Sequence, residues 1–172
     1  MTGIVIQALP VSRGILAIAP MPGSGDDYAD DLAHLKDWQP AMVVTMTTAA
    51  EMAAAGIATL GRDIAFMGTR WVHVPTPDYG VPDVGAMGQW TAAEAAALAA
   101  LRGGGRIVVH CRQGGGRAGM AALRLMIAAG EAPEAATVRL RAQVPGAVET
   151  SAQMRWAMRG GAEPVDSSVR KR

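Results

Sequence analysis

A single cysteine, Cys111, occurs in this chain of 172 residues. One thiol cannot build an intrachain disulfide framework. The usual structural zinc sites need several cysteine or histidine ligands, and the three histidines are scattered along the sequence. We therefore expect no metal and no cofactor.

Excess charge of one sign and long apolar runs are lacking as well. The 16 basic and 15 acidic residues leave a formal net charge of +1, which gives no support to a broad nucleic-acid or membrane footprint. No apolar run approaches the roughly 20 residues that span a bilayer, and the amino-terminal residues do not follow a secretory-signal pattern. We expect a cytoplasmic monomer that binds neither nucleic acid nor membrane.

Aromatic residues make up only 4% of the chain, whereas half of all residues are apolar. The expected core is therefore built from Ala, Val, Leu, Ile and Met. The length fits one domain, and we predict that it covers residues 1–160 and is followed by a flexible polar tail, residues 161–172.

Strand and helix patterns alternate along this domain. Apolar, β-branched runs predict strands at 3–10, 14–20, 41–47, 70–76 and 106–110, of which the first two form a hairpin. Helical patterns cover 26–38, 48–56, 91–102, 117–129, 133–143 and 151–159. Residues 75–89 hold three prolines and three glycines and are expected to be irregular, with Thr91 and Glu94 forming a capping box for the next helix. The order predicts a single α/β domain with a central, mostly parallel sheet of about five strands and helices on both faces.

The segment HCRQGGGRAG, residues 110–119, joins a predicted strand to a predicted apolar helix. Ligands bind beyond the carboxyl ends of strands in such sheets. Gly114, Gly115 and Gly116 allow the backbone to curl, so that its N–H groups and the following helix amino terminus form an anion cradle. The positive field favours a thiolate at Cys111, and Arg117 can hold two phosphate oxygens. These groups suit in-line attack on a phosphate monoester; the alternative is an inert buried cysteine beside a glycine turn.

Other residues are expected to support this chemistry. Arg112 is placed at the rim, on the substrate side, and His110 behind the loop, which it holds by hydrogen bonds. A leaving alkoxide or phenoxide needs a proton, and Asp78 in PTPDYGVPD is the first candidate for the general acid. Asp83 is the second candidate, and for either aspartate the alternative role is that of a turn-capping residue.

HCRQGGGRAG resembles the signature loop of cysteine-dependent protein tyrosine phosphatases, which reads His, Cys, five residues, Arg. The fuller pattern is similar to the compact dual-specificity branch, and most to bacterial relatives of kinase-associated phosphatase. PTPDYGVPD is similar to the general-acid loop of that group, DDLAHLKDWQPAMVVTMTTAAEMAAAGI to its early helix–strand–helix, and VPGAVETSAQ (144–153) to the segment after its second carboxyl-terminal helix. The resemblance covers residues 14–159.

The resemblance implies a dual-specificity phosphatase-like fold and a protein tyrosine or dual-specificity phosphatase. Its substrate would be a phosphorylated protein or a small phosphomonoester, and it would need no metal. Cys111 would attack phosphorus while Asp78 protonates the leaving oxygen, and Arg117 with the amides of residues 112–116 would stabilise the charge of the transition state. Gln113 and Ala118 belong to the same phosphate-binding loop. Gln153 would help to place the water that hydrolyses the phosphocysteine.

Two departures from the family pattern bear on function. Ala118 stands where the family usually has Ser or Thr, whose hydroxyl stabilises the departing thiolate, so we expect slow breakdown of the phosphoenzyme. Val144 stands in place of an Arg before Pro-Gly. Two alternatives therefore stay open: a phosphate-binding module with low turnover, and a rhodanese-type sulfur transferase. A sulfur transferase needs no general acid, so the presence of the acid-bearing segment PTPDYGVPD argues against the second alternative.

Overall fold

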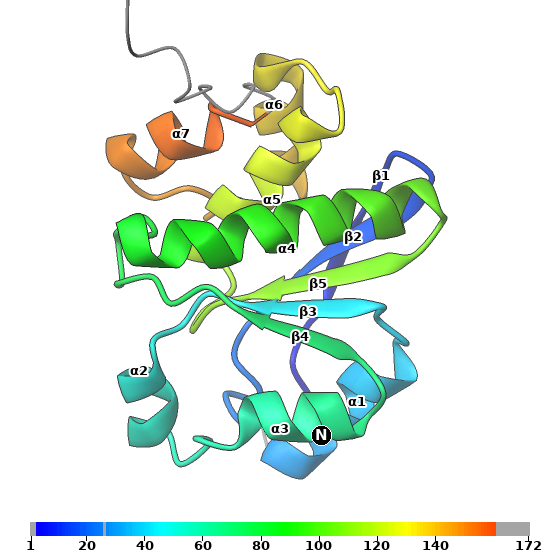
Figure 1. Ribbon diagram of the computed structural model, residues 1–172, viewed down its shortest axis with the longest axis vertical. Helices are drawn as coiled ribbons and strands as arrows, with labels where there is room; N and C mark the ends of the chain where they lie inside the picture. Colours follow the sequence, from blue (N-terminus) through cyan, green and yellow to red (C-terminus); the bar gives the residue numbers. More distant parts are fainter. Residues whose placement is uncertain (1–2, 26, 161–172) are drawn as a thin grey trace, which may run out of the picture.

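The computed structural model describes residues 3–25 and 27–160. A five-stranded sheet lies at its centre in the order β1-β2-β5-β3-β4 (Figure 1). β1 is antiparallel to β2, whereas β2, β5, β3 and β4 are parallel to one another. The predicted α/β fold with a mostly parallel sheet is confirmed. The predicted tail, residues 161–172, and Asp26 lie outside the described residues.

The elements follow the predicted order with one addition. The strands are β1 (Gln7–Val11), β2 (Gly14–Ala19), β3 (Met42–Thr45), β4 (Arg70–His73) and β5 (Arg106–His110). The helices are α1 (Tyr28–Asp37), α2 (Ala49–Ala54), α3 (Leu60–Phe66), α4 (Val84–Arg102), α5 (Gly116–Ala128), α6 (Pro133–Gln143) and α7 (Ser151–Ala157). Sequence analysis did not anticipate α3, and β1 begins at Gln7 rather than at residue 3.

Helices cover both faces of the sheet. α1 and α3 lie below it in Figure 1, and α4 and α5 lie above it with α6 and α7 beyond. Side chains of the central strands alternate between the two cores: Ile107 and Val109 face the α4–α5 side, whereas Val108 faces the α1–α3 side. Among the described residues, no helix combines the length and the apolar character that crossing a membrane requires.

The expected start of α4 is wrong. α4 begins at Val84 because the side chain of Asp83 accepts a hydrogen bond from the backbone N–H of Ala86 at 2.8 Å and so caps the helix. Thr91 and Glu94 therefore lie inside the helix, where Glu94 accepts a hydrogen bond from the indole of Trp90 at 2.9 Å. The stabilisation gained by burying one face of α4 outweighs the low helix propensity of the glycines in its first turns. The buried residues are Ala86, Trp90, Ala93, Ala97 and Leu101.

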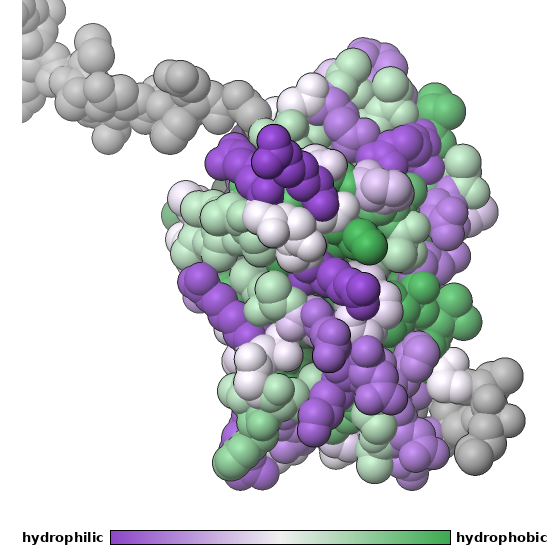
Figure 2. All heavy atoms as spheres, turned by 90° about the vertical axis from the view of Figure 1, so that its right-hand side faces the viewer, coloured by the Kyte–Doolittle hydropathy of each residue, from purple (hydrophilic) through white to green (hydrophobic). Residues whose placement is uncertain are grey.

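Strand register brings three segments to one edge of the sheet. Thr45, at the end of β3, lies opposite both His73 of β4 and His110 of β5. The segments that follow these strands therefore leave the sheet together, at the left-hand edge in Figure 1. The opposite edge, which faces the viewer in Figure 2, is mostly hydrophilic with separate apolar patches.

Candidate active site

The segment after β5 forms the floor of a pocket at this edge. Cys111 is buried, with 3% of its surface exposed. The pocket is lined by Asp78, Tyr79, Cys111, Arg112, Gln113, Gly116, Arg117 and Glu149. The structure thus brings the predicted nucleophile, general acid and arginine to one place. We call residues 111–117 the phosphate loop and residues 75–83 the acid loop.

At two positions of the phosphate loop the backbone or the surroundings disfavour a side chain. Gly114 has a φ of 77°, in the left-handed region that side chains disfavour. Gly116 opens α5, and a Cβ there would overlap the carboxylate of Glu149, whose exposed side chain would have to move. Gly115 is the N-cap of α5 and no side chain caps this helix, so its first backbone N–H groups are left for a ligand in the loop.

Arg117 is held by a bidentate ion pair. Its Nη1 and Nη2 donate to the two carboxylate oxygens of Glu51 at 2.7 and 2.9 Å, and Nη1 also donates to the carbonyl of Thr76 at 2.9 Å. The side chain of Arg117 is only 2% exposed. Burial alone would lower the pKa of Arg117, but the hydrogen bonds and charge of Glu51 outweigh it and raise that pKa. The hydrogen bond from Arg117 in turn lowers the pKa of Glu51.

These contacts leave one edge of the guanidinium available. A guanidinium carries five N–H donors, and Glu51 and Thr76 take both on Nη1 and one on Nη2. The Nε–H and the second N–H of Nη2 point along the same edge, which matches two oxygens of a phosphate. Glu51 therefore fixes the arginine without consuming its capacity to bind an anion.

His110 lies behind the phosphate loop, as expected. Its Nδ1 is 3.3 Å from the carbonyl of Cys111, and because a carbonyl only accepts, Nδ1 carries the proton. Nε2 then accepts from the hydroxyl of Thr45 at 2.6 Å, while the same hydroxyl accepts from the indole of Trp71 at 2.8 Å. Burial lowers the pKa of His110 to about 4, so the imidazole is neutral. A neutral network thus ties the loop to three strands.

The general-acid candidates take different places. Asp78 lies in the pocket, where its carboxylate is 2.8 Å from Nη2 of Arg112 and 3.7 Å from Nη2 of Arg117. Asp83 caps α4 instead, as the alternative role predicted. Arg112 is half exposed at the rim of the pocket. The acid loop therefore presents a single carboxylate, that of Asp78, to the phosphate loop.

A family model described as "Swiss Army Knife protein, DSP-PTPase phosphatase domain" (PTP-SAK) matches residues 12–165. The chain belongs to this phosphatase-domain family. No curated protein sequence matches the chain. The resemblance to compact dual-specificity phosphatases is confirmed; the particular closeness to bacterial relatives stays a prediction.

Solved structures of phosphatases share the fold of this PTP-SAK domain. Kinase-associated phosphatase, with its catalytic-site cysteine changed to serine, has a TM-score of 0.81 at 22% identity, over 92% of this chain and 94% of that one. Tk-PTP in its active form has a TM-score of 0.69 at 23% identity, over 92% and 98% of the two chains. PTPMT1 in complex with PI(5)P has a TM-score of 0.72 at 16% identity, over 90% and 94%.

Two of the remaining predicted residues of the PTP-SAK domain are fully buried. Ala118 lies in the first turn of α5 with no exposed surface, in the same apolar cluster as Cys111. Gln153 is also completely buried. Gln113 lines the pocket and adjoins a wider cleft of about 510 Å³ between the phosphate loop and residues 3–7.

Sequence reasoning missed two acidic residues of the site. Glu51 forms a capping box with Thr48 at the start of α2, and the Thr-x-x-Glu pattern in the sequence could have predicted this role. The second role of Glu51, its ion pair with Arg117, has no local sequence signal. Glu149 lines the pocket and lies in the segment VPGAVETSAQ, which was noted only for its similarity to the family and was assigned no acidic site residue. Both reach the site from elements distant in sequence from the phosphate loop.

Proposed function

We propose that this phosphatase domain acts on phosphotyrosine proteins, and on phosphoserine or phosphothreonine as well if its pocket is shallow, through a phosphocysteine intermediate. The observation that carries the proposal is the shared pocket of Cys111, Arg117 and Asp78. Nucleophile, anion clamp and proton donor are the three parts that cleavage of a phosphate monoester needs.

In the first step the thiolate of Cys111 attacks phosphorus and the P–O bond to the leaving group breaks. Asp78 gives its proton to the leaving oxygen, and Arg117 with the loop amides binds the charge on the equatorial oxygens. In the second step water attacks the phosphocysteine, Asp78 takes a proton from that water, and the S–P bond breaks. Inorganic phosphate and the Cys111 thiolate result, and Asp78 is again protonated.

Hydrolysis of p-nitrophenyl phosphate tests this proposal. We expect vanadate-sensitive activity in the wild type and none in Cys111→Ser. On phenyl phosphate, whose poor leaving group needs a proton, we expect a loss of about 100-fold or more in Asp78→Asn, because general acids contribute roughly 10² to 10⁴ in rate. Asp83→Asn is the matched control: it removes an equivalent carboxylate from the same loop, and because Asn caps a helix about as well as Asp, both stability and activity should be kept.

Phosphate or vanadate binding without turnover in the wild type would indicate the low-turnover module instead. Sulfur transfer from thiosulfate without phosphatase activity would indicate the rhodanese-type alternative. The substrate class follows from rates on phosphotyrosine peptides, phosphothreonine peptides and PI(5)P, each compared with inorganic phosphate release from Cys111→Ser.

A further inference from the structure

The acid loop is tied to the start of α7 by two hydrogen bonds. The side-chain Nε2 of Gln153 donates to the carbonyl of Gly80 at 3.2 Å, and the hydroxyl of Thr150 donates to the carbonyl of Tyr79 at 3.4 Å. Gly80 lies two residues after Asp78. The backbone that carries the general acid is therefore attached to an element more than 70 residues away in sequence.

The amide of Gln153 is almost fully committed to these contacts. Its Oε1 accepts from the backbone N–H of Glu149 at 2.7 Å and of Thr150 at 3.2 Å. Two N–H donors face one end of the amide and a carbonyl faces the other, so the partners decide which end is oxygen. One N–H remains, on a side chain with no exposed surface. Gln153 is thus placed to hold the acid loop and is poorly placed to meet a water.

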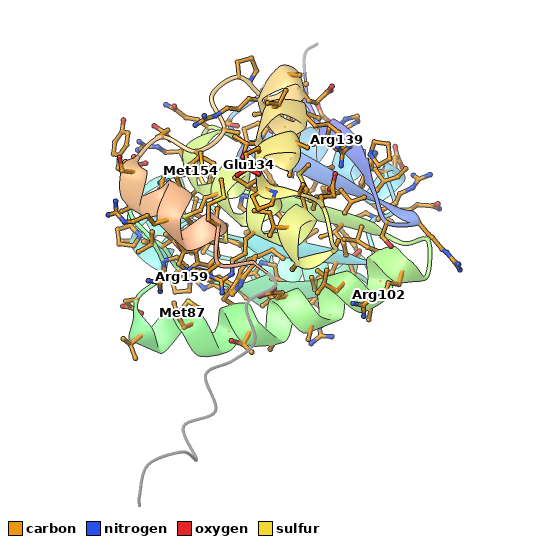
Figure 3. All side chains as sticks on the ribbon, turned by 90° about the horizontal axis from the view of Figure 1, so that it is seen from above. Met87, Arg102, Glu134, Arg139, Met154 and Arg159 are labelled. Carbon is orange, nitrogen blue, oxygen red and sulfur yellow. The ribbon has the colours of Figure 1, made fainter. Side chains whose placement is uncertain are left out.

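The base of this attachment is packed into the core. Trp156 of α7 packs edge-on against Trp90 of α4 with ring centroids 4.8 Å apart, and its indole nitrogen lies 3.3 Å from the sulfur of Met87. Figure 3 shows the carboxyl-terminal end of α7 beside the start of α4, where Met87 and Arg159 are labelled. A helix anchored in this way can fix the position of a loop that it contacts.

The acid loop also needs to be held. Tyr79 has a φ of 62°, a left-handed conformation that costs a residue with a Cβ about 1 to 2 kcal/mol. Its backbone N–H donates to the carboxylate of Asp78 at 3.1 Å, so the strained turn and the orientation of the acid are coupled. The two carbonyls that accept hydrogen bonds from the start of α7, those of Tyr79 and Gly80, belong to the two peptide groups that directly follow this strained residue.

We propose that Gln153 is a positioning residue for the general acid: it holds the acid loop closed so that Asp78 faces the leaving oxygen. This inference rests on the proposed phosphatase function. It differs from the role that the resemblance implies, because a residue that places the hydrolytic water acts only in the second step. A residue that positions Asp78 acts in both steps, because Asp78 is the acid in the first and the base in the second. Its effect on the first step grows with the need of the leaving group for a proton.

Gln153→Glu is the sharpest variant. It keeps the size of the side chain and an acceptor for the N–H groups of Glu149 and Thr150, and Glu serves as well as Gln in a capping box. It lacks the donor for Gly80 and places a carboxylate oxygen against that carbonyl. Gln143→Glu, on the exposed end of α6, is the matched control for the same chemical change.

Leaving-group dependence gives the deciding measurement. For phenyl phosphate, a poor leaving group, we expect kcat/KM of Gln153→Glu to fall by about 10- to 100-fold, part of the full contribution of a general acid. For p-nitrophenyl phosphate, which needs little protonation, we expect a loss of no more than about threefold. Equal losses on both substrates would overturn the proposal. So would a lower kcat with unchanged kcat/KM and a larger burst of phenol, the result that a water-placing role predicts.

A second measurement does not depend on turnover. Backbone amide hydrogen exchange in residues 78–82 should be faster in Gln153→Glu than in Gln143→Glu, and equal rates would contradict the proposal even if the protein hydrolyses no phosphate. If Gln153→Glu fails to fold, Thr150→Asp replaces it. This variant keeps an N-cap acceptor for α7 but has no donor for Tyr79, so the same exchange and leaving-group pattern is expected with a smaller amplitude.

Discussion

Each carboxylate oxygen of Glu51 accepts one hydrogen bond from the guanidinium of Arg117, although 66 residues separate them in sequence. The pair joins the end of the phosphate loop to α2, and Arg117 is buried whereas Glu51 is partly exposed. The raised pKa of Arg117 and the lowered pKa of Glu51 express the same attraction from its two sides. The ion pair keeps the buried guanidinium of Arg117 charged and orients the free edge of that guanidinium towards the anion site.

We predict that Glu51→Gln lowers the free energy of unfolding by about 2 kcal/mol, because a charged hydrogen-bond partner is lost beside a buried cation. We expect kcat/KM to fall by about tenfold or more as Arg117 loses its fixed orientation. Denaturant unfolding and steady-state rates measure the two effects. Glu131→Gln is the control: it breaks a partly exposed pair with Arg139, remote from the pocket, and should cost less than about 1 kcal/mol without changing activity.

Ala118→Ser should accelerate the second step. A hydroxyl in the first turn of α5 can stabilise the Cys111 thiolate as it leaves phosphorus, so we expect kcat to rise by about tenfold, or about 1.4 kcal/mol, with kcat/KM unchanged. Rapid-quench kinetics should show a burst in the wild type that shrinks in the variant. Ala121→Ser, equally buried on the same helix, is the control for a buried hydroxyl. An unchanged steady-state rate in Ala118→Ser would contradict this prediction.

His110 makes stability depend on pH. Burial, with smaller contributions from the charges of His73 and Arg117, lowers its folded-state pKa to about 4, whereas the ordinary value is 6.5. The unfolded state therefore binds more protons between these values, so this contribution is complete above pH 6.5 and is lost as pH falls towards 4, by about 3 kcal/mol.

His110→Asn, which keeps an N–H near the position of Nδ1, removes this titration. We expect it to be less stable than the wild type at pH 7, and we expect the difference in unfolding free energy to narrow by about 3 kcal/mol at pH 4. Urea unfolding at several pH values measures the difference. His34→Asn, on the exposed side of α1, controls for loss of an imidazole. A difference for His110→Asn that does not vary with pH would contradict a neutral, buried imidazole.

Gly119 sets how closely the Ala147–Val148 turn approaches α5. A Cβ at Gly119 would lie 2.6 Å from the Cα of Ala147 and 3.0 Å from the backbone nitrogen of Val148. We predict that Gly119→Ala costs about 2 kcal/mol by overpacking. Gly88→Ala, also in a helix but with no neighbour within 4 Å, should instead stabilise the protein by about 1 kcal/mol. Thermal unfolding distinguishes the two, and equal shifts would refute the role assigned to Gly119.

Local patterns were sufficient for most of the elements. β-branched apolar runs marked β3 and β5, and Pro133 marked the first residue of α6, because strand pairing and helix initiation depend on nearby side chains. α4 shows the limit of such patterns. Gly85 and Gly88 argued for a loop, but the cap by Asp83 and the burial of Trp90 outweighed their local preference, and burial is a tertiary quantity.

The sequence by itself determined the chemistry at the end of β5. Cys111, the three glycines and Arg117 lie within one short loop, so folding of that loop alone places a nucleophile beside an anion cradle. Local spacing was therefore enough to predict this part of the site. Only the tertiary structure decided what holds that chemistry in place. Glu51 reaches Arg117, and Gln153 reaches the acid loop, across 66 and 73 residues. Contacts of this kind depend on parallel strands ending at one edge and on helices packing above them, and no local pattern records which distant side chains will meet there.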